Sequence, residues 1–253
     1  MLSRRLIVCL DVLEGRVVKG VQFESLKEMG DPWTLACRYE AEGADEIVFL
    51  NIAASSEPLD RLVATVRRTA DDLFIPLTVG GGIGSVAEIG NMLRAGADKV
   101  SINSAAVARP ALLAEAADRF GSQCVVASID ARRDDGKWKV YTGGGRVATT
   151  LDAVEWAVEC ARRGAGEILL TSIDRDGTRA GYDIGLTRAV ADAVTVPVVA
   201  SGGGGSSMHV IAVLNDGGAD AALMAGVFHD GTCRIGDVKR AMHDAGVPVR
   251  MAA

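Results

Sequence analysis

The sequence predicts an α/β fold, a single (βα)8 TIM barrel made of two half-barrels that repeat one another. Residues 77–103 and 198–225 share one pattern, in which an apolar run, a glycine cluster, an amphipathic stretch and Gly-Ala-Asp lead into a second apolar run. The repeat extends to Asp11 and Asp130, which end two matching apolar runs. Alternating strand and helix patterns that repeat over half a chain indicate two fused copies of a four-unit βα module.

Eight short apolar runs mark the expected strands: residues 6–10, 47–52, 77–79, 100–102, 124–129, 168–172, 196–200 and 221–225. Their continuous apolar character fits parallel strands that are buried on both faces. Helical patterns separate the runs, and eight strands with eight helices close most simply into a barrel. A doubly wound open sheet is the alternative, but it gives no reason for the twofold repeat.

We expect one domain, residues 1–253, with half-barrels at about 1–120 and 121–253, because no linker-like stretch interrupts the midpoint. Two long segments, residues 13–31 and 131–151, follow the first and fifth strands. Long connections in a compact barrel are usually functional, so we expect them to be loops above the active site. In the second, Asp135-Gly136 predicts a hairpin turn.

Composition excludes several classes of function. A net charge of −6 provides no basic stripe for a nucleic acid or an anionic membrane. Five cysteines without a C-x-x-C spacing are typical of reduced residues in a cytosolic protein. The first apolar run ends at Asp11, too early for a signal peptide or a membrane span. We therefore expect a cytoplasmic protein, and since its three histidines fit no ligand spacing, we expect no metal.

Asp11 and Asp130 are the expected catalytic pair. In a closed barrel they would face each other across the carboxyl-terminal end of the strands, where barrel enzymes have their active sites. A single aspartate at a strand end often caps the next loop. Two at matched positions, each before a long segment, favour a general acid and a general base whose environments separate their pKa values.

Two glycine clusters, residues 80–82 and 202–205, are expected to bind phosphate groups. Their backbone N–H groups can approach an anion closely, and the following helix adds partial positive charge. A lone cluster is also typical of a tight turn, but neighbouring strand ends supply further donors, from residues 101–104, 176–178 and 225–226. Two such sites imply a substrate with a phosphate at each end. Lys19 fits an anion contact and a solvated loop position equally well.

Charged residues precede four strands at the other end of the barrel: Arg5, Glu46, Lys99 and Glu167. Two charges of each sign can form a ring of ion pairs that closes this end. A structural role is the usual interpretation, because features at this face normally serve stability.

Several segments resemble the cyclase subunit of imidazole glycerol phosphate synthase, among them CLDVLEGRVVKG (9–20), IPLTVGGGIGSV (75–86), RAGADKVSINSAAV (94–107) and GAGEILLTSIDRDGTRAGYD (164–183). The resemblance covers residues 2–250. It implies a lyase of histidine biosynthesis without a cofactor. Such an enzyme uses ammonia to convert a phosphoribulosyl-formimino aminoimidazole carboxamide ribonucleotide into imidazole glycerol phosphate and aminoimidazole carboxamide ribonucleotide.

The resemblance also implies roles for single residues. Asp11 corresponds to the general base, Asp130 to the general acid and Lys19 to a lysine of a mobile loop. One phosphate would contact Gly82, Asn103 and Ser104. The other would contact Asp176, Gly177, Gly203, Ala225 and Gly226. Thr171 and Ser201 match polar positions around the substrate.

A glutaminase subunit is the implied partner, and it would form a heterodimer at the end of the barrel opposite the active site. Ammonia would then pass through the barrel centre. Arg5, Glu46, Lys99 and Glu167 match a gate for ammonia, and Asp98 matches a docking residue.

Four residues depart from the pattern of the resembling family. Asn51 replaces a usual Asp, Gly226 a Ser that contacts phosphate, Gly143 a His or larger residue, and Gly84 a frequent Arg. Asn51 and Gly226 leave open a catalytically weakened barrel that only binds a bisphosphate or a glutaminase. The related bisphosphate sugar isomerase of histidine biosynthesis is the other alternative.

Overall fold

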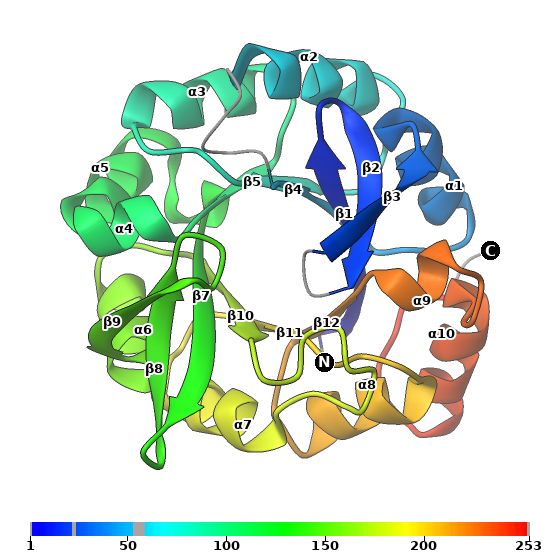
Figure 1. Cartoon of the computed structure of the whole chain (residues 1–253). Helices are drawn as coiled ribbons and strands as arrows, with labels where there is room; N and C mark the ends of the chain where they lie inside the picture. Colours follow the sequence, from blue (N-terminus) through cyan, green and yellow to red (C-terminus); the bar gives the residue numbers. More distant parts are fainter. Residues whose placement is uncertain (1, 22–23, 53–58, 252–253) are drawn as a thin grey trace.

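Eight parallel strands form a closed barrel in the computed structural model, which describes residues 2–21, 24–52 and 59–251 (Figure 1). In chain order the barrel strands are β1 (Arg5–Leu13), β4 (Glu46–Asn51), β5 (Leu77–Gly80), β6 (Lys99–Ile102), β7 (Val125–Asp134), β10 (Glu167–Ser172), β11 (Val198–Ser201) and β12 (Ala221–Met224). Each strand pairs in parallel with the next, and β12 pairs with β1. The predicted fold class is confirmed.

Eight longer helices surround the barrel (Figure 1): α1 (Pro32–Ala41), α2 (Leu59–Ala70), α3 (Val86–Arg94), α5 (Ala111–Phe120), α6 (Ala153–Arg162), α7 (Ile184–Ala193), α8 (Ser207–Asn215) and α10 (Ile235–Asp244). Side chains of Asp or Ser cap the start of five of them by accepting backbone N–H groups, as at Asp31 and Ser85. Two short helices, α4 (Ser104–Ala108) and α9 (Gly226–His229), follow β6 and β12, and a 3-10 turn, η1 (Ser122–Cys124), precedes β7.

The apolar core has two layers. The larger layer lies between the strands and the surrounding helices. The smaller one fills the inside of the barrel with residues from alternating positions of the strands: Ile7, Cys9, Val48, Val126, Leu169, Val199, Ala221 and Leu223. Side chains therefore pack the barrel interior, as is usual for an eight-stranded barrel.

Both long segments form β-hairpins. Strands β2 (Arg16–Val21) and β3 (Glu24–Gly30) extend β1, while β8 (Lys137–Thr142) and β9 (Val147–Asp152) extend β7, all in antiparallel pairing. The predicted turn at Asp135 and Gly136 is confirmed by positive φ at both residues, 47° and 80°. Glu14 and Gly15 form the same kind of turn, with φ of 51° and 74°.

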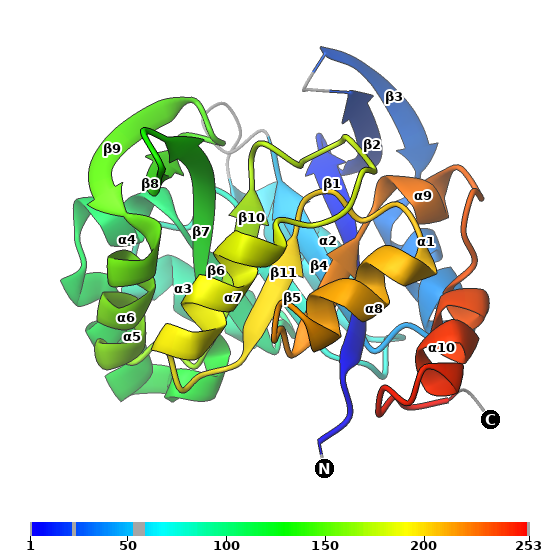
Figure 2. The same ribbon diagram turned by 90° about the horizontal axis from the view of Figure 1, so that it is seen from below.

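Both β-hairpins stand at one end of the barrel, and the amino terminus lies at the other (Figure 2). We call the first end, where the barrel strands finish, the mouth, and the opposite end the floor. Among the described residues, no helix combines the length and the apolar character needed to cross a membrane.

Candidate active site

Asp11 and Asp130 lie at equivalent points of the two halves, where β1 and β7 leave the barrel. In register, Asp11 pairs with Val18 of its hairpin and with Leu50 of the next barrel strand. Asp130 pairs in the same way with Tyr141 and Thr171. Because β1 and β7 lie on opposite sides of the ring (Figure 1), the two aspartates border the mouth from opposite sides.

The mouth favours the protonated form of both carboxyl groups. Burial, and after it the negative charge of Asp176, raise the pKa of Asp11 from 3.8 to about 6. Burial and Asp176 likewise raise the pKa of Asp130 to about 6. The side chain of Asp176 is exposed, but the surrounding protein removes part of its hydration, and this desolvation also raises the pKa of the carboxyl group. Three acidic groups thus interact electrostatically at one site.

Asn103 contacts Asp130. Its Nδ2 donates hydrogen bonds to Asp130 Oδ2, at 2.9 Å, and to the backbone oxygen of Tyr141, at 3.3 Å. The first of these bonds favours the ionised form of Asp130 and lowers its pKa. Asn103 Oδ1 is buried and has no hydrogen-bond partner among the described residues. The amide group that sequence resemblance assigned to phosphate therefore also orients Asp130.

The first glycine cluster turns sharply at the end of β5. Gly81 and Gly82 have φ of 92° and 76°, and a side chain at Gly81 would lie 2.2 Å from the backbone oxygen of Asn51. Only glycine fits this turn. Ser104 lies nearby at the start of α4, and its Oγ accepts a hydrogen bond from the N–H of Gly143 at 3.0 Å. Gly143 has a φ of 61°, which favours glycine there.

The second glycine cluster packs against the loop that follows β10. Gly203 has a φ of 100°, and a side chain there would lie 2.2 Å from the backbone oxygen of Gly181. In return, the N–H of Gly181 donates to Gly203 O at 2.8 Å. Gly177 lies in the same loop with a φ of 73°. Thr171 and Ser201, the predicted polar residues, pair with each other in register at the ends of β10 and β11.

The two expected phosphate sites are built alike. Asn103 precedes α4 with φ −112° and ψ −87°, and Ala225 precedes α9 with φ −135° and ψ −84°. At the second site, Lys19 Nζ donates to the backbone oxygen of Gly226 at 3.2 Å and to Asp230 Oδ2 at 2.8 Å. Lys19 therefore lies beside the expected second phosphate site, and Asp230 is a partner that sequence reasoning missed.

The four charged residues at the floor form a ring of ion pairs, which we call the floor ring. Arg5 bonds to Glu46 (2.7 Å) and Glu167, and Lys99 bonds to the same two glutamates at 2.9 and 2.7 Å. Burial alone would raise the pKa of Glu167, but Lys99 and Arg5 lower it overall. Thr78, which the sequence did not single out, donates to Glu46 at 2.6 Å.

Asp98, the expected docking residue, has an internal hydrogen bond. Its Oδ2 accepts the N–H of Leu77, the first residue of β5, at 2.8 Å. Asp45 and Asp220 make the same contact with Leu6 and Val198. These aspartates fix the starts of three barrel strands, so a structural role for Asp98 exists in addition to any contact with a partner.

His229 is the last residue of α9. Its ring connects two other elements, since Nδ1 lies 2.7 Å from Tyr39 Oη and Nε2 lies 3.1 Å from the backbone oxygen of Cys9. Burial lowers its pKa to about 4, so the ring is neutral near pH 7. Its neutral ring thus joins α9 to α1 and β1 below the mouth.

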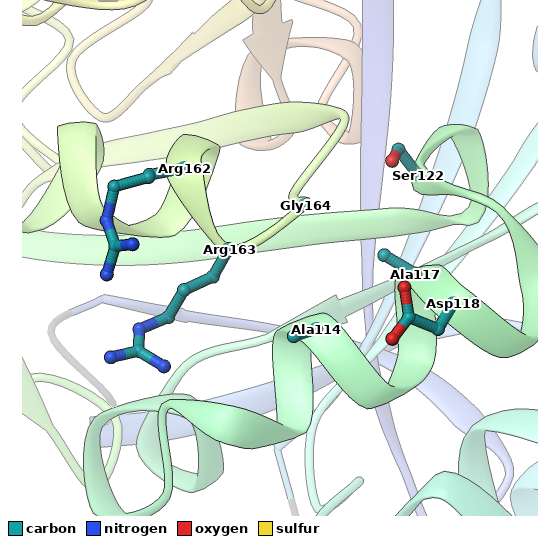
Figure 3. A pocket seen from close by; sticks show the side chains of 7 residues that line it. All are labelled: Ala114, Ala117, Asp118, Ser122, Arg162, Arg163 and Gly164. Carbon is teal, nitrogen blue, oxygen red and sulfur yellow. The ribbon is translucent and has the colours of Figure 1, made fainter.

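A pocket of about 380 Å³ lies outside the barrel, between the carboxyl-terminal ends of α5 and α6 (Figure 3). Arg162 and Arg163 line it, and both pair with Glu159. Asp118 adds a further negative charge to the wall. Since these carboxylates offset the arginines, the pocket offers no excess charge for an anion.

Comparison with known proteins gives a consistent result. The family model for "Histidine biosynthesis protein" matches residues 5–234. The chain is 65% identical over 250 residues to the imidazole glycerol phosphate synthase subunit HisF of Myxococcus xanthus (strain DK1622), covering 99% of both chains. It is 57% identical over 258 residues to the protein of the same name from Thermosynechococcus vestitus (strain NIES-2133 / IAM M-273 / BP-1), covering all of this chain and 92% of that one.

Proposed function

The chain belongs to the histidine biosynthesis protein family, and within it to the HisF subunits of imidazole glycerol phosphate synthase; from this premise we propose that it is an ammonia-dependent cyclase. It converts the phosphoribulosyl-formimino aminoimidazole carboxamide ribonucleotide into imidazole glycerol phosphate and aminoimidazole carboxamide ribonucleotide. This is a lyase reaction without a metal or other cofactor, and we assign it to the cytoplasm.

The proposed chemistry depends on Asp11 and Asp130. Asp11 acts as the general base and Asp130 as the general acid on opposite sides of a substrate that lies across the mouth. The observation that carries this assignment is their equivalent position at the base of the two hairpins, together with pKa values near 6 for both. A carboxyl group with a pKa near the working pH can both accept and donate protons efficiently.

The two glycine clusters bind the phosphates at the two ends of the substrate. Gly82, Asn103 and Ser104 serve one phosphate. Asp176, Gly177, Gly203, Ala225 and Gly226 serve the other. Backbone N–H groups at such turns favour an anion. Asp176 lies in the loop after β10 that packs against the second cluster, and its negative charge helps to raise the pKa of both Asp11 and Asp130.

A glutaminase subunit is the proposed partner, in a heterodimer at the floor. Ammonia would enter past the floor ring and travel through the barrel to the mouth. The floor ring supports a gate because Arg5 and Lys99 each contact both glutamates, so that moving one cation leaves the other in place. Asp98 would contact the partner near the ring.

The test is turnover of the bisphosphate substrate by the isolated chain with ammonium salt as the nitrogen source. We expect turnover without glutamine, and Asp11→Asn should lower kcat by roughly 10²- to 10⁴-fold. Asp192→Asn, which changes an exposed aspartate that pairs with Arg188 on α7, is the control and should leave kcat unchanged. Undiminished turnover in Asp11→Asn would refute the assignment of the base.

The same assay separates the alternatives. The related sugar isomerase would convert its bisphosphate substrate without ammonia. The weakened barrel is suggested by Asn51 and Gly226, and it would bind the bisphosphate without forming product. A requirement for ammonia together with two products supports the cyclase alone.

A further inference from the structure

Two cationic side chains and one carboxylate meet at the second phosphate site. Asp230 Oδ2 accepts hydrogen bonds from Lys19 Nζ, at 2.8 Å, and from the guanidinium group of Arg179. Asp230 Oδ1 accepts the backbone N–H and the hydroxyl of Thr232, at 3.1 and 2.6 Å. Because Thr232 fixes one oxygen of the carboxylate, the other oxygen can hold both cations in place.

The two cations fill the space beside Gly226. A Cβ atom at Gly226 would lie 3.1 Å from Cε and 3.5 Å from Nζ of Lys19, and 3.6 Å from a guanidinium nitrogen of Arg179. Gly226 has no side-chain donor to offer an anion. The charged groups of Lys19 and Arg179 therefore lie where a donor on residue 226 would be.

The backbone holds Arg179 in an uncommon conformation. Its φ is 56°, in the left-handed region that residues with a side chain rarely adopt. Gly205 makes this placement possible, since a Cβ there would lie 2.2 Å from the backbone oxygen of Arg179. Because Gly205 has no side chain, Arg179 can lie beside the second phosphate site. Such strain often marks functional positions.

The charges and the remaining donors suit a phosphate group. Two cations and one carboxylate give a net charge of +1, and the side chains of Lys19 and Arg179 are 24% and 40% exposed. Lys19 directs two N–H groups at Asp230 and Gly226, which leaves a third. A guanidinium group has five N–H donors, and among the described residues Arg179 uses its donors on Asp230 alone.

We propose that Arg179 binds a phosphate of the substrate at the second glycine cluster together with Lys19, and that Asp230 is a positioning residue that holds both cations beside Gly226. The inference rests on the proposed function for the identity of the substrate. The chemistry that it requires is a phosphate monoester, for which a planar guanidinium provides paired hydrogen bonds.

The test is titration of the isolated chain with inorganic phosphate, followed by the backbone amide NMR signals of Gly203 and Gly226 for the second site and of Gly82 for the first. Arg179→Gln should weaken binding at the second site about tenfold, a loss typical of one charge-assisted hydrogen bond, and leave the first site unchanged. Arg188→Gln removes the same charge on α7 and should change neither. In turnover assays, Arg179→Gln should raise KM for the bisphosphate and spare kcat.

Two further variants examine how the site is built. Asp230→Asn should also weaken phosphate binding at the second site, although it removes a negative charge, because both cations lose their anchor. Gly226→Ser should restore part of the binding in the Arg179→Gln chain, because it adds a hydroxyl donor where the guanidinium group was, although Lys19 Cε, 3.1 Å from the new Cβ, must shift slightly. It should add little to the unaltered chain.

Unchanged phosphate binding at the second site in Arg179→Gln would overturn the proposal. So would the absence of any shift in the Gly203 and Gly226 amide signals when phosphate is added to the unaltered chain. Tighter binding in Asp230→Asn would show that Asp230 competes with phosphate and would overturn its positioning role. A chain that binds phosphate there but lacks ammonium-dependent turnover would contradict the proposed function alone.

Discussion

Glu46 and Glu167 occupy equivalent positions in the two halves of the barrel, and each accepts hydrogen bonds from both Arg5 and Lys99. In register, Glu46 pairs with Ile7 of β1, and Glu167 pairs with Val126 of β7. The cations do not repeat, because the position equivalent to Lys99 is Ala221. Two repeated carboxylates are thus neutralised by cations that each serve both halves.

Lys99→Met is therefore expected to destabilise the isolated chain. Glu46 is only 2% exposed, and the substitution leaves it and Glu167 to share Arg5. Removing one partner of a buried ion pair costs about 3 kcal/mol or more in the free energy of unfolding. Urea denaturation at pH 7 measures the loss, and Arg188→Met, in an exposed ion pair, should lose less than about 1 kcal/mol. Equal losses in the two variants would show that the floor ring contributes no more than a surface pair.

Asp11→Asn should stabilise the fold while it removes activity. The folded protein raises the pKa of Asp11 from 3.8 to about 6, so the stability that this group contributes is present below pH 3.8 and is lost as the pH rises through 6. At pH 8 we expect a gain on the order of 1–2 kcal/mol, reduced by water in the open mouth. The gain should vanish below pH 4. Denaturation curves at both pH values check the sign, and a loss of stability at pH 8 would contradict it.

Asp176→Asn should lower the pKa of both Asp11 and Asp130. Its negative charge is the second cause, after burial, of the raised values at Asp11 and Asp130. Without it, both groups ionise at lower pH, and the acidic limb of the pH profile of kcat/KM moves to lower pH. Ammonium-dependent turnover between pH 5 and 8 measures the shift. A limb that stays in place would show that Asp176 does not act on the pair.

Asn103→Ala should have the opposite effect on one member of the pair. Nδ2 of Asn103 stabilises the ionised form of Asp130, so its loss raises the pKa of that carboxyl above about 6. NMR titration of 13C-labelled aspartate resolves Asp130 from Asp11, whose pKa should not change. Asn103→Gln keeps the amide group on a longer side chain. The pKa of Asp130 in this variant should lie between its values in the unaltered chain and in Asn103→Ala. A lowered pKa for Asp130 in Asn103→Ala would exclude this role.

Gly203→Ala should disrupt the second glycine cluster. Besides the positive φ, the new methyl group would lie 2.2 Å from Gly181 O, so the loop after β10 must move. Gly136→Ala, in the turn between β8 and the preceding strand β7, is the matched control, since its φ is also positive but no atom lies within 4 Å of the added Cβ. We expect about 1 kcal/mol of destabilisation in the control and clearly more in Gly203→Ala, with loss of phosphate binding at the second site. Calorimetry and phosphate titration compare the two variants.

Sequence reasoning predicted the barrel because its signals are local and repeated. Continuous apolar runs marked each barrel strand, and the matched halves required a closed ring. The strands of the hairpins were missed because residues 13–31 and 131–151 mix polar and apolar residues without a long apolar run. Their pairing also depends on β1 and β7 continuing beyond Asp11 and Asp130. Within these two segments, the sequence predicted only the turn at Asp135 and Gly136.

The sequence predicted the candidate-site residues that lie at strand ends, but it did not predict the residues that contact them. Asp230 lies after α9 and Arg179 after β10, far apart in the chain, and nothing in the local pattern links either to Lys19. The bond from Asn103 to Asp130 likewise depends on how two adjacent strands end. Such contacts follow from barrel closure, which a linear pattern does not describe.

The two aspartates proposed as acid and base lie in strands that run without a break from the barrel into the hairpins. In the proposed mechanism, a hairpin that closed over the substrate would also tilt the strand that carries its aspartate. Covering the substrate and orienting the acid or base would then occur together on each side.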